Sequence, residues 1–175
     1  MSKPYRIRVN EMIGVQDFST FQIEQVPLVS QERFAELIAQ VLVEAGWEQG
    51  EDGKLTMDGK GGETFVFDPE TLQIQTQVSD ERKVDKELES WKQDDLEQRA
   101  SDFLDRQTQI LEEQVANQLS EHHEERVQQF EGYVTEATGR ALKELAETMG
   151  DVQDIHEVRG ENGSYQLTIS IQEYE

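Results

Sequence analysis

The spacing of hydrophobic residues changes twice along the chain, from strand-like alternation to a helical repeat and back again. The helical stretch covers residues 80–149, where no proline occurs and apolar residues recur every three or four positions. This spacing is typical of an amphipathic helix with one apolar stripe. It predicts one extended helix or a helical hairpin over 80–149, and its stripe comprises Val84, Leu88, Trp91, Leu96, Ala100, Phe103, Leu104, Ile110, Leu111, Val115, Leu119, Val127, Phe130, Val134, Ala137, Ala141, Leu142 and Leu145.

A single helix over this range would be on the order of 100 Å long, at 1.5 Å per residue. A small domain cannot bury such a stripe, so the run must fold back, pair with a second copy or lie against a partner. The stripe thins to polar residues at 121–125, and Gly132 costs up to about 1 kcal/mol relative to alanine inside a helix. We therefore expect a break between Ser120 and Gly132. The heptad pattern is too irregular to predict a dimeric coiled coil.

Before this run, short alternating segments predict strands, with one helix among them. Residues 5–9 and 18–26 are candidate strands joined by a turn near Gly14, and Arg6 and Arg8 are expected on a solvated strand face. Ser30 is the expected N-cap of an amphipathic helix over 34–45 that ends at Gly46. Residues 54–57, 64–67 and 72–78 predict a three-stranded meander with a turn at 58–62.

After the run, Gly150 is expected to end the helix, and residues 152–158 and 165–171 alternate again around a turn at 160–163. They predict a hairpin, and the pattern leaves open whether it also joins the earlier sheet. The fold class predicted is α+β, with small antiparallel β-sheet elements flanking a long acidic helical hairpin. The expected parts are an N-terminal α+β part at 1–79, a helical region at 80–149 and a C-terminal hairpin at 150–175.

Charge narrows the range of partners. The 175 residues include 38 acidic and 16 basic ones, which gives a formal net charge of -22. Such a charge disfavours direct binding to nucleic acid or to anionic membrane surfaces and favours a protein partner with a basic surface. The absence of cysteine excludes disulfides and thiolate chemistry. No segment has the apolar length of a signal peptide or a membrane span, so we expect a soluble cytoplasmic protein.

The glycine-rich segment 58–62 invites comparison with a phosphate-binding loop. A P-loop requires serine or threonine after its lysine, followed by a helix whose N-terminus holds the phosphates. In this chain Gly61 follows Lys60, and the next residues have the pattern of a strand. The segment is therefore predicted to be the tip of a hairpin.

The run 121–125 is the one cluster of histidines and carboxylates in the sequence. The helical zinc motif needs a second histidine four residues after His122, and Arg126 occupies that position. His122 or His123 with a nearby glutamate supplies at most two ligands, fewer than a zinc site uses. Neighbouring carboxylates at 94–95, 112–113 and 124–125 point in different directions on a helix. We therefore expect no catalytic residue, no cofactor site, no metal site and no enzymatic activity.

The C-terminal part has a helix–glycine–hairpin pattern at residues 139–146, 149–152 and 162–171. This block, about a quarter of the chain, resembles small accessory proteins of bacterial conflict systems. Those systems combine AAA+ ATPases of the FtsH or MoxR type with von Willebrand factor A domains. The resemblance implies a non-enzymatic adaptor in a multi-protein assembly, and it assigns no functional residue.

The function expected from these features is that of a non-catalytic accessory or adaptor protein that acts by protein–protein contact. The alternative is an acidic inhibitor or nucleic-acid mimic, whose carboxylates imitate a phosphate array and block a basic enzyme surface. An acidic surface that serves only solubility is the simplest interpretation. The unpaired stripe of the helical region leaves a homo-oligomer through that region open.

Overall fold

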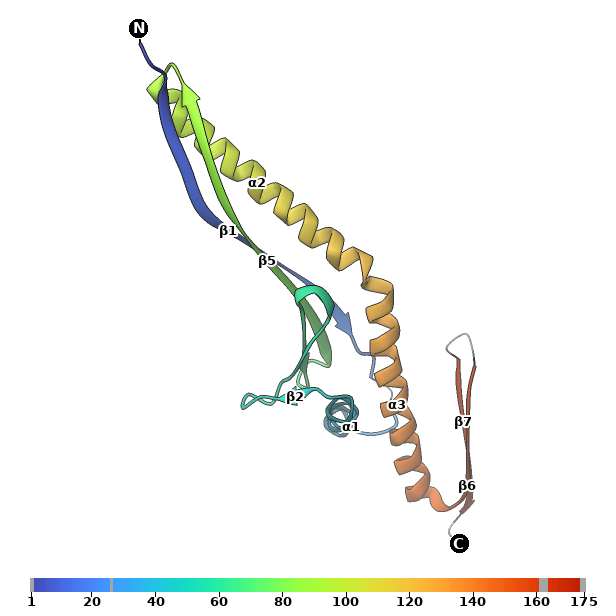
Figure 1. Cartoon of the computed structure of the whole chain (residues 1–175). Coiled ribbons are helices and arrows are strands. Elements are labelled where there is room, and N and C mark those ends of the chain that lie inside the picture. Colours follow the sequence, from blue (N-terminus) through green and yellow to red (C-terminus); the bar gives the residue numbers. More distant parts are fainter. Residues whose placement is uncertain (1, 26, 161–163, 174–175) are drawn as a thin grey trace. The chain divides into compact units, whose positions relative to one another are not determined.

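The computed structural model describes residues 2–25, 27–160 and 164–173 (Figure 1). The structure contains both α-helices and antiparallel β-sheets, which confirms the predicted α+β class. In chain order the elements are β1 (Tyr5–Gln22), α1 (Gln31–Glu44), β2 (Glu48–Gln49), β3 (Leu55–Asp58), the short 3-10 turn η1 (Lys60–Gly62), β4 (Glu63–Asp68), β5 (Gln73–Ser90), α2 (Gln93–Glu121), α3 (His123–Met149), β6 (Gly150–Arg159) and β7 (Tyr165–Glu173).

The strands form two separate sheets. The five-stranded sheet has the order β1-β5-β4-β3-β2, and β6 pairs with β7 in a two-stranded sheet. The neighbouring positions of β3, β4 and β5 confirm the predicted meander. In the antiparallel β6–β7 hairpin, Ile155 pairs with Ile169 and His156 with Thr168, and an irregularity separates Val152 from Asp154. The C-terminal hairpin is thus confirmed, and it does not join the larger sheet.

The chain forms two compact units, each assembled from segments that are distant in sequence. The first unit comprises Met1–Ser19, Asp58–Thr64 and Thr76–His123, and the second comprises Thr20–Met57, Phe65–Gln75 and Glu124–Glu175. The helices α2 and α3 belong to different units. The parts expected at 1–79, 80–149 and 150–175 are each continuous in sequence, whereas each of the two units combines three separate segments.

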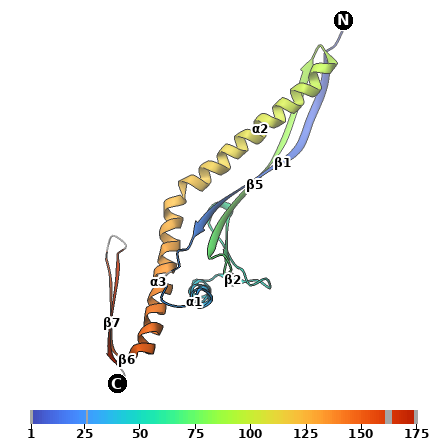
Figure 2. The same cartoon turned by 180° about the vertical axis from the view of Figure 1, so that it is seen from behind.

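In the first unit, α2 lies along the ribbon made by β1 and β5 (Figures 1 and 2). Val9 and Ile13 of β1, Val84 of β5 and Leu111 of α2 are buried together, with Phe103 packed against them. A second cluster comprises Val78, Val115 and Leu119. Apart from the exposed Ile110, the stripe of α2 is therefore buried or half-buried against strands of the same chain, so a second copy is not needed to cover it.

The helix predicted from residue 80 begins only at Gln93, and residues 80–90 continue β5. The error has a simple cause, since a spacing of four positions fits two periods of a strand as well as one turn of a helix. Val84 and Leu88 have this spacing, and they lie on the same face of β5 as the buried Val78. Trp91, assigned to the helical stripe, is 68% exposed and precedes the helix.

The turn predicted near Gly14 was also wrong, because β1 runs unbroken from Tyr5 to Gln22. The period of two continues through the glycine: Val9, Ile13 and Val15 occupy alternate positions and belong to the core beneath α2. Arg8 lies on the other, solvated face, as expected, and makes two 2.8 Å hydrogen bonds to Asp85 on β5. A glycine alone therefore did not mark a turn here.

The predicted break in the helical run is confirmed at His122, which separates α2 from α3. His122 has φ −98° and ψ 7°, outside the helical region, so the backbone leaves the helix for one residue. This position falls in the polar stretch where the apolar stripe thins. Gly132 and Gly139, by contrast, lie inside α3.

The second unit is built around α1, as the amphipathic pattern predicted. The side chain of Ser30 accepts a hydrogen bond from the backbone N–H of Arg33, which confirms the N-cap, and Gly46 follows the helix with φ +102°. Apolar residues of α1, of the sheet strands and of α3 form one core. Its fully buried members include Phe34, Ile38, Leu42, Leu55, Phe67 and Ile74.

Aromatic rings hold α3 to this core. Phe130 of α3 packs edge-on against Phe65 of β4 with ring centroids 5.3 Å apart, and it contacts Phe21 at 5.5 Å. Trp47 stacks on Phe65 at 6.0 Å and meets Tyr133 of α3 edge-on. Such pairs add about 0.5–1.5 kcal/mol beyond the area that they bury. The aromatic side chains therefore contribute directly to the packing of α3 on the core of this unit, together with the buried Ala137 and Ala141.

Candidate interaction surfaces

The residues singled out for chemistry do not assemble into a reaction centre in the described part of the chain. His122 occupies the break between the helices, and His123 begins α3. Among the residues that the structure describes, no group of three or more histidines, aspartates and glutamates is placed to hold a metal ion.

The acidic pairs lie on exposed helix surfaces. Asp94 and Asp95 occupy the first turn of α2, and Glu124 and Glu125 occupy the first turn of α3. Carboxylates at these positions interact favourably with the positive end of the helix dipole. The helix dipole therefore explains why these carboxylates lie at the helix N-termini, and no catalytic role is needed to explain them.

The glycine-rich segment is the tip of a hairpin, as predicted. Gly61 and Gly62 adopt positive φ values in the turn η1, and β4 follows directly. Gln118 of α2 donates a hydrogen bond to the carbonyl oxygen of Gly61. A helix N-terminus that would hold phosphates does not follow the loop, because the chain continues as a strand.

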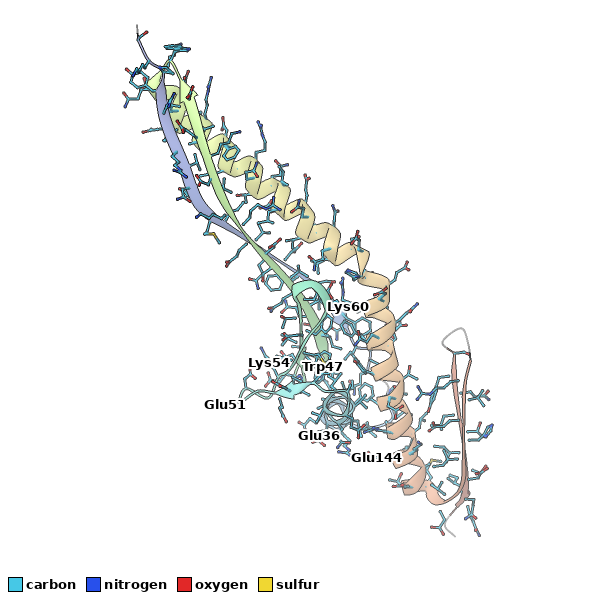
Figure 3. The ribbon with its side chains drawn as sticks, in the orientation of Figure 1. Glu36, Trp47, Glu51, Lys54, Lys60 and Glu144 are labelled. Atoms are coloured by element: carbon cyan, nitrogen blue, oxygen red, sulfur yellow. The ribbon has the colours of Figure 1, made fainter. Side chains whose placement is uncertain are left out.

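Ion pairs connect α3 to α1 in the second unit, and the sequence pattern did not indicate them. Arg33 of α1 donates from Nε to both carboxylate oxygens of Glu144 at 3.1 Å, and from Nη1 to Glu36 at 2.8 Å. Arg140 of α3 hydrogen-bonds the carboxylate of Glu44 at the end of α1. Figure 3 labels Glu36 and Glu144 on the two helices. Arg33 and Glu144 are 111 residues apart in sequence. The local sequence around either residue therefore does not indicate that they pair.

Further ion pairs connect the β6–β7 hairpin to α3. Lys143 donates to Glu157 of β6 at 2.6 Å, and Arg159 donates to Glu136 at 2.8 Å. The guanidinium of Arg159 also lies 5.4 Å from the ring centroid of Tyr165 on β7. These contacts orient the hairpin on α3 through charge as well as through apolar packing.

The ion pairs lower the pKa of the carboxyl groups that take part in them. The hydrogen bond from Arg33 holds the pKa of Glu144 below its ordinary value of 4.5, and Arg140 and Lys143 do the same for Glu44 and Glu157. A carboxyl group whose pKa is lowered by folding stabilises the folded state above its unfolded pKa. That contribution is lost as the pH falls through the folded pKa.

Glu144→Gln is therefore expected to lower the urea midpoint of unfolding at pH 7, by a small amount because the pair is solvent-exposed. The difference from the wild type should begin to shrink below pH 4.5, where Glu144 becomes protonated in the unfolded chain, and should vanish as the pH falls through the lower pKa that Arg33 gives this carboxyl in the folded state. Urea titrations from pH 7 to pH 3 measure this convergence. Glu112→Gln, on the exposed surface of α2, is the control, and a pH-independent difference for Glu144→Gln would contradict the ion-pair explanation.

An open groove of about 890 Å³ lies on the second unit. One wall is the N-terminal half of α1, and the other comes from β2, β3, the connection between them and the turn after β4. Its apolar lining residues, which form the floor, are buried or half-buried: Ala35, Ala39, Leu55 and Pro69. The rim is polar and comprises Ser30, Gln31, Glu32, Glu36, Gln49 and Glu70.

The groove is negatively charged. No lysine or arginine lines it among the described residues, whereas Glu32, Glu36 and Glu70 do. The N-terminus of α1 opposes them with the equivalent of about half a positive charge, and Arg33 neutralises part of the charge of Glu36. The three carboxylates carry more charge than the helix N-terminus and Arg33 offset, so the net charge at the groove is negative. Figure 3 labels Glu36 on α1 and Glu51 and Lys54 on the connection between β2 and β3.

Together these features define an acidic α+β protein with an open, apolar-floored groove and no metal-binding cluster in its described residues. None of the helices in the described part combines the length and hydrophobicity needed to span a bilayer. Residues 1–172 match the model of a protein family described as FtsH ternary system domain X5, and the chain belongs to that family. No curated protein and no solved structure gave a significant match.

The family match confirms the FtsH part of the resemblance that the C-terminal pattern suggested. It extends over nearly the whole chain, whereas the pattern covered only the last part. The link to MoxR-type ATPases and von Willebrand factor A domains stays a prediction.

Proposed function

We propose that this protein is a non-catalytic adaptor of an FtsH-linked system and that it binds a basic segment of a partner protein in the groove of the second unit. The observation that carries the proposal is the combination of an apolar floor with a carboxylate rim in one groove. Membership of the FtsH ternary system domain X5 family supports a role in a multi-component assembly.

The side chains of the groove favour binding over catalysis. Its polar groups are amides, exposed carboxylates and Ser30, and the hydroxyl of Ser30 already caps α1. Acid–base catalysis needs carboxylates with pKa values pushed apart by burial or by close neighbours. Glu32, Glu36 and Glu70 are exposed on the rim instead, where they can meet cationic side chains of a partner.

The volume of the groove lies within the range of about 300–1,000 Å³ that is typical of small-ligand sites. A groove of this volume that is open to solvent can take a few side chains of a partner segment. Ala35 and Ala39 lie one helical turn apart on the floor and leave room for apolar side chains of a partner. Exposed ion pairs contribute only about 0.2–1 kcal/mol each. We therefore expect affinity to come mainly from the apolar floor, and orientation and salt dependence to come from the carboxylates.

A charge-reversal variant tests the proposal. The triple variant Glu32→Lys, Glu36→Lys and Glu70→Lys should recover an FtsH-type ATPase, or another component of its system, at least about tenfold less than the wild type does. The expected factor corresponds to about 1.4 kcal/mol. The measurement is affinity capture from the native host with quantitative mass spectrometry, followed by titration of the purified component.

The matched control reverses the same number of charges on α2, with Glu97→Lys, Glu112→Lys and Glu113→Lys at exposed positions. This control should retain the captured component. An equal loss in both variants would show that overall charge, not the groove, determines binding. Capture of a DNA-binding enzyme that DNA or salt releases would instead favour the acidic inhibitor or nucleic-acid mimic. An enzymatic activity that the groove variant abolishes would contradict the non-catalytic role.

A further inference from the structure

The edge strand β7 carries no charge from Tyr165 to Gln172. The other uncharged run of this length, residues 71–79, lies mostly in β5, which is covered on both edges by β1 and β4. Charged residues make up 31% of the whole sequence. The partner strand β6 is charged in the usual way, with Asp151, Asp154, Glu157 and Arg159. Natural proteins place charges on exposed edge strands to prevent unwanted pairing. By this criterion the edge of β6 is protected and the edge of β7 is not.

In the part of the chain that the structure describes, β6 and β7 form a two-stranded sheet, so each has one edge without a strand neighbour. An isolated hairpin is marginally stable in water and needs further strands or a helix. The helix α3 supplies part of that cover, and a Cβ added at Gly139 would lie 2.9 Å from the Tyr165 hydroxyl. The cover is incomplete, since an open pocket of about 430 Å³ remains between Leu142 and Leu167.

Apolar side chains of the hairpin are accordingly only half covered. Leu167, Ile169 and Ile171 of β7 are half-buried, and Ile155 and Val158 of β6 are 42% and 44% exposed. Apolar residues at this level of exposure on a small sheet indicate that the sheet has room for a further strand.

We propose that β7 pairs antiparallel with β7 of a second copy of this chain, about a two-fold axis at Thr168. This register sets Tyr165 opposite Ile171, Leu167 opposite Ile169, and Thr168 opposite itself. Apolar residues then face apolar residues on one face of the sheet, and polar residues face polar ones on the other. Aromatic–β-branched and threonine–threonine pairs of this kind each contribute about 0.2–1 kcal/mol.

The charge distribution explains why a second copy would meet at this strand. Copies that carry a net charge of -22 repel each other, and like charges set directly opposite each other across strands are destabilising. In the proposed register β7 brings no charged side chain to the two-fold axis. A two-fold interface requires self-complementarity of one surface, which the alternating pattern of β7 provides.

The expected association is weak. One added strand pair buries less surface than the roughly 1,200 Å² of a stable protein interface, so a dissociation constant in the micromolar range or weaker is expected. Salt should strengthen the dimer, because it screens the repulsion between the acidic copies. The groove of the second unit plays no part in this contact, and the inference does not depend on the proposed adaptor function.

The chain has no cysteine, so a single introduced thiol can report the register. In the proposed dimer the two copies of residue 168 are directly opposite, with Cα atoms about 4.5–5.5 Å apart, within the range that a disulfide bridges. The control is His156→Cys, at the exposed position paired with Thr168 inside the hairpin. The two copies of residue 156 would be about 14 Å apart, across three strand spacings, which is too far for a disulfide.

Full-length Thr168→Cys is therefore expected to form disulfide-linked dimers under copper–phenanthroline oxidation at least about tenfold faster than His156→Cys, at a rate that rises with protein concentration. Equal rates for the two variants would overturn the proposal. Sedimentation equilibrium gives a second measurement: Thr168→Glu should weaken self-association about tenfold and His156→Glu should not. A wild-type chain that stays monomeric up to about 1 mM in high salt would also overturn it.

Discussion

Phe130→Ala is expected to destabilise the second unit by about 3–5 kcal/mol, the usual cost of removing a buried phenylalanine ring. Phe130 is 2% exposed and contacts both Phe21 and Phe65. Its loss would leave a cavity where α3 meets the sheet, and it would remove two aromatic contacts at once. Urea unfolding measures the cost through the fluorescence of the buried Trp47, in a background where the exposed Trp91 is replaced by phenylalanine.

The control is Phe18→Ala, which removes the same ring from a side chain that is 45% exposed on β1. A surface substitution of this kind usually changes stability by no more than about 0.5 kcal/mol. Similar costs for the two variants would contradict the packing described for α3. An unchanged urea midpoint of Trp47 fluorescence for Phe130→Ala, relative to the wild type, would also contradict this packing.

Leu111→Ala is expected to destabilise the first unit by about 2–5 kcal/mol. Leu111 is fully buried between α2 and the ribbon, where it contacts the cluster that contains Val9, Ile13 and Val84. The ribbon and the helix have few other large, fully buried side chains to compensate for the cavity. Far-ultraviolet circular dichroism during thermal and urea unfolding measures the effect through loss of helix.

The neighbouring residue provides a matched control, because Ile110 is 36% exposed on the same helix. Ile110→Ala should cost clearly less than Leu111→Ala, since alanine has the higher helix propensity and the Ile110 side chain is only partly buried. If Ile110→Ala cost as much as Leu111→Ala, the face of α2 assigned to the ribbon would be wrong.

Sequence reasoning succeeded where one element buries one face. In α1, Phe34, Leu37, Ile38 and Leu42 follow the helical period, and Ser30 caps the helix as predicted. The meander and the C-terminal hairpin were found because alternation and turn residues agree. The helical run was divided correctly near His122, since the apolar stripe fades there.

Sequence reasoning failed where two periods coincide. Val84 and Leu88 fit a helix and a strand equally well, and the choice was decided by the pairing of β5 with β1. The turn proposed at Gly14 failed because glycine is tolerated inside a strand when its neighbours pair. Neither error could be corrected locally, because the deciding contacts join residues that are distant along the chain.

The groove and the ion pairs were missed for the same reason. Arg33 lies in the first turn of α1, and its partner Glu144 lies on another helix, 111 residues away in sequence. The groove combines α1 with β2, β3 and the turn at Pro69, and each wall looks ordinary in sequence. Only the folded arrangement brings the carboxylates and the apolar floor together.

Local pattern and composition were thus sufficient to establish the α+β class, most of the elements, the acidic character and the break in the helical run. These properties depend on the period of burial and on the charge count, both of which are local or additive. The tertiary structure decided the length of β1 and β5, the cover of each helical stripe and the location of the groove. Those features depend on contacts between distant segments, and a contact has no signature in either segment alone.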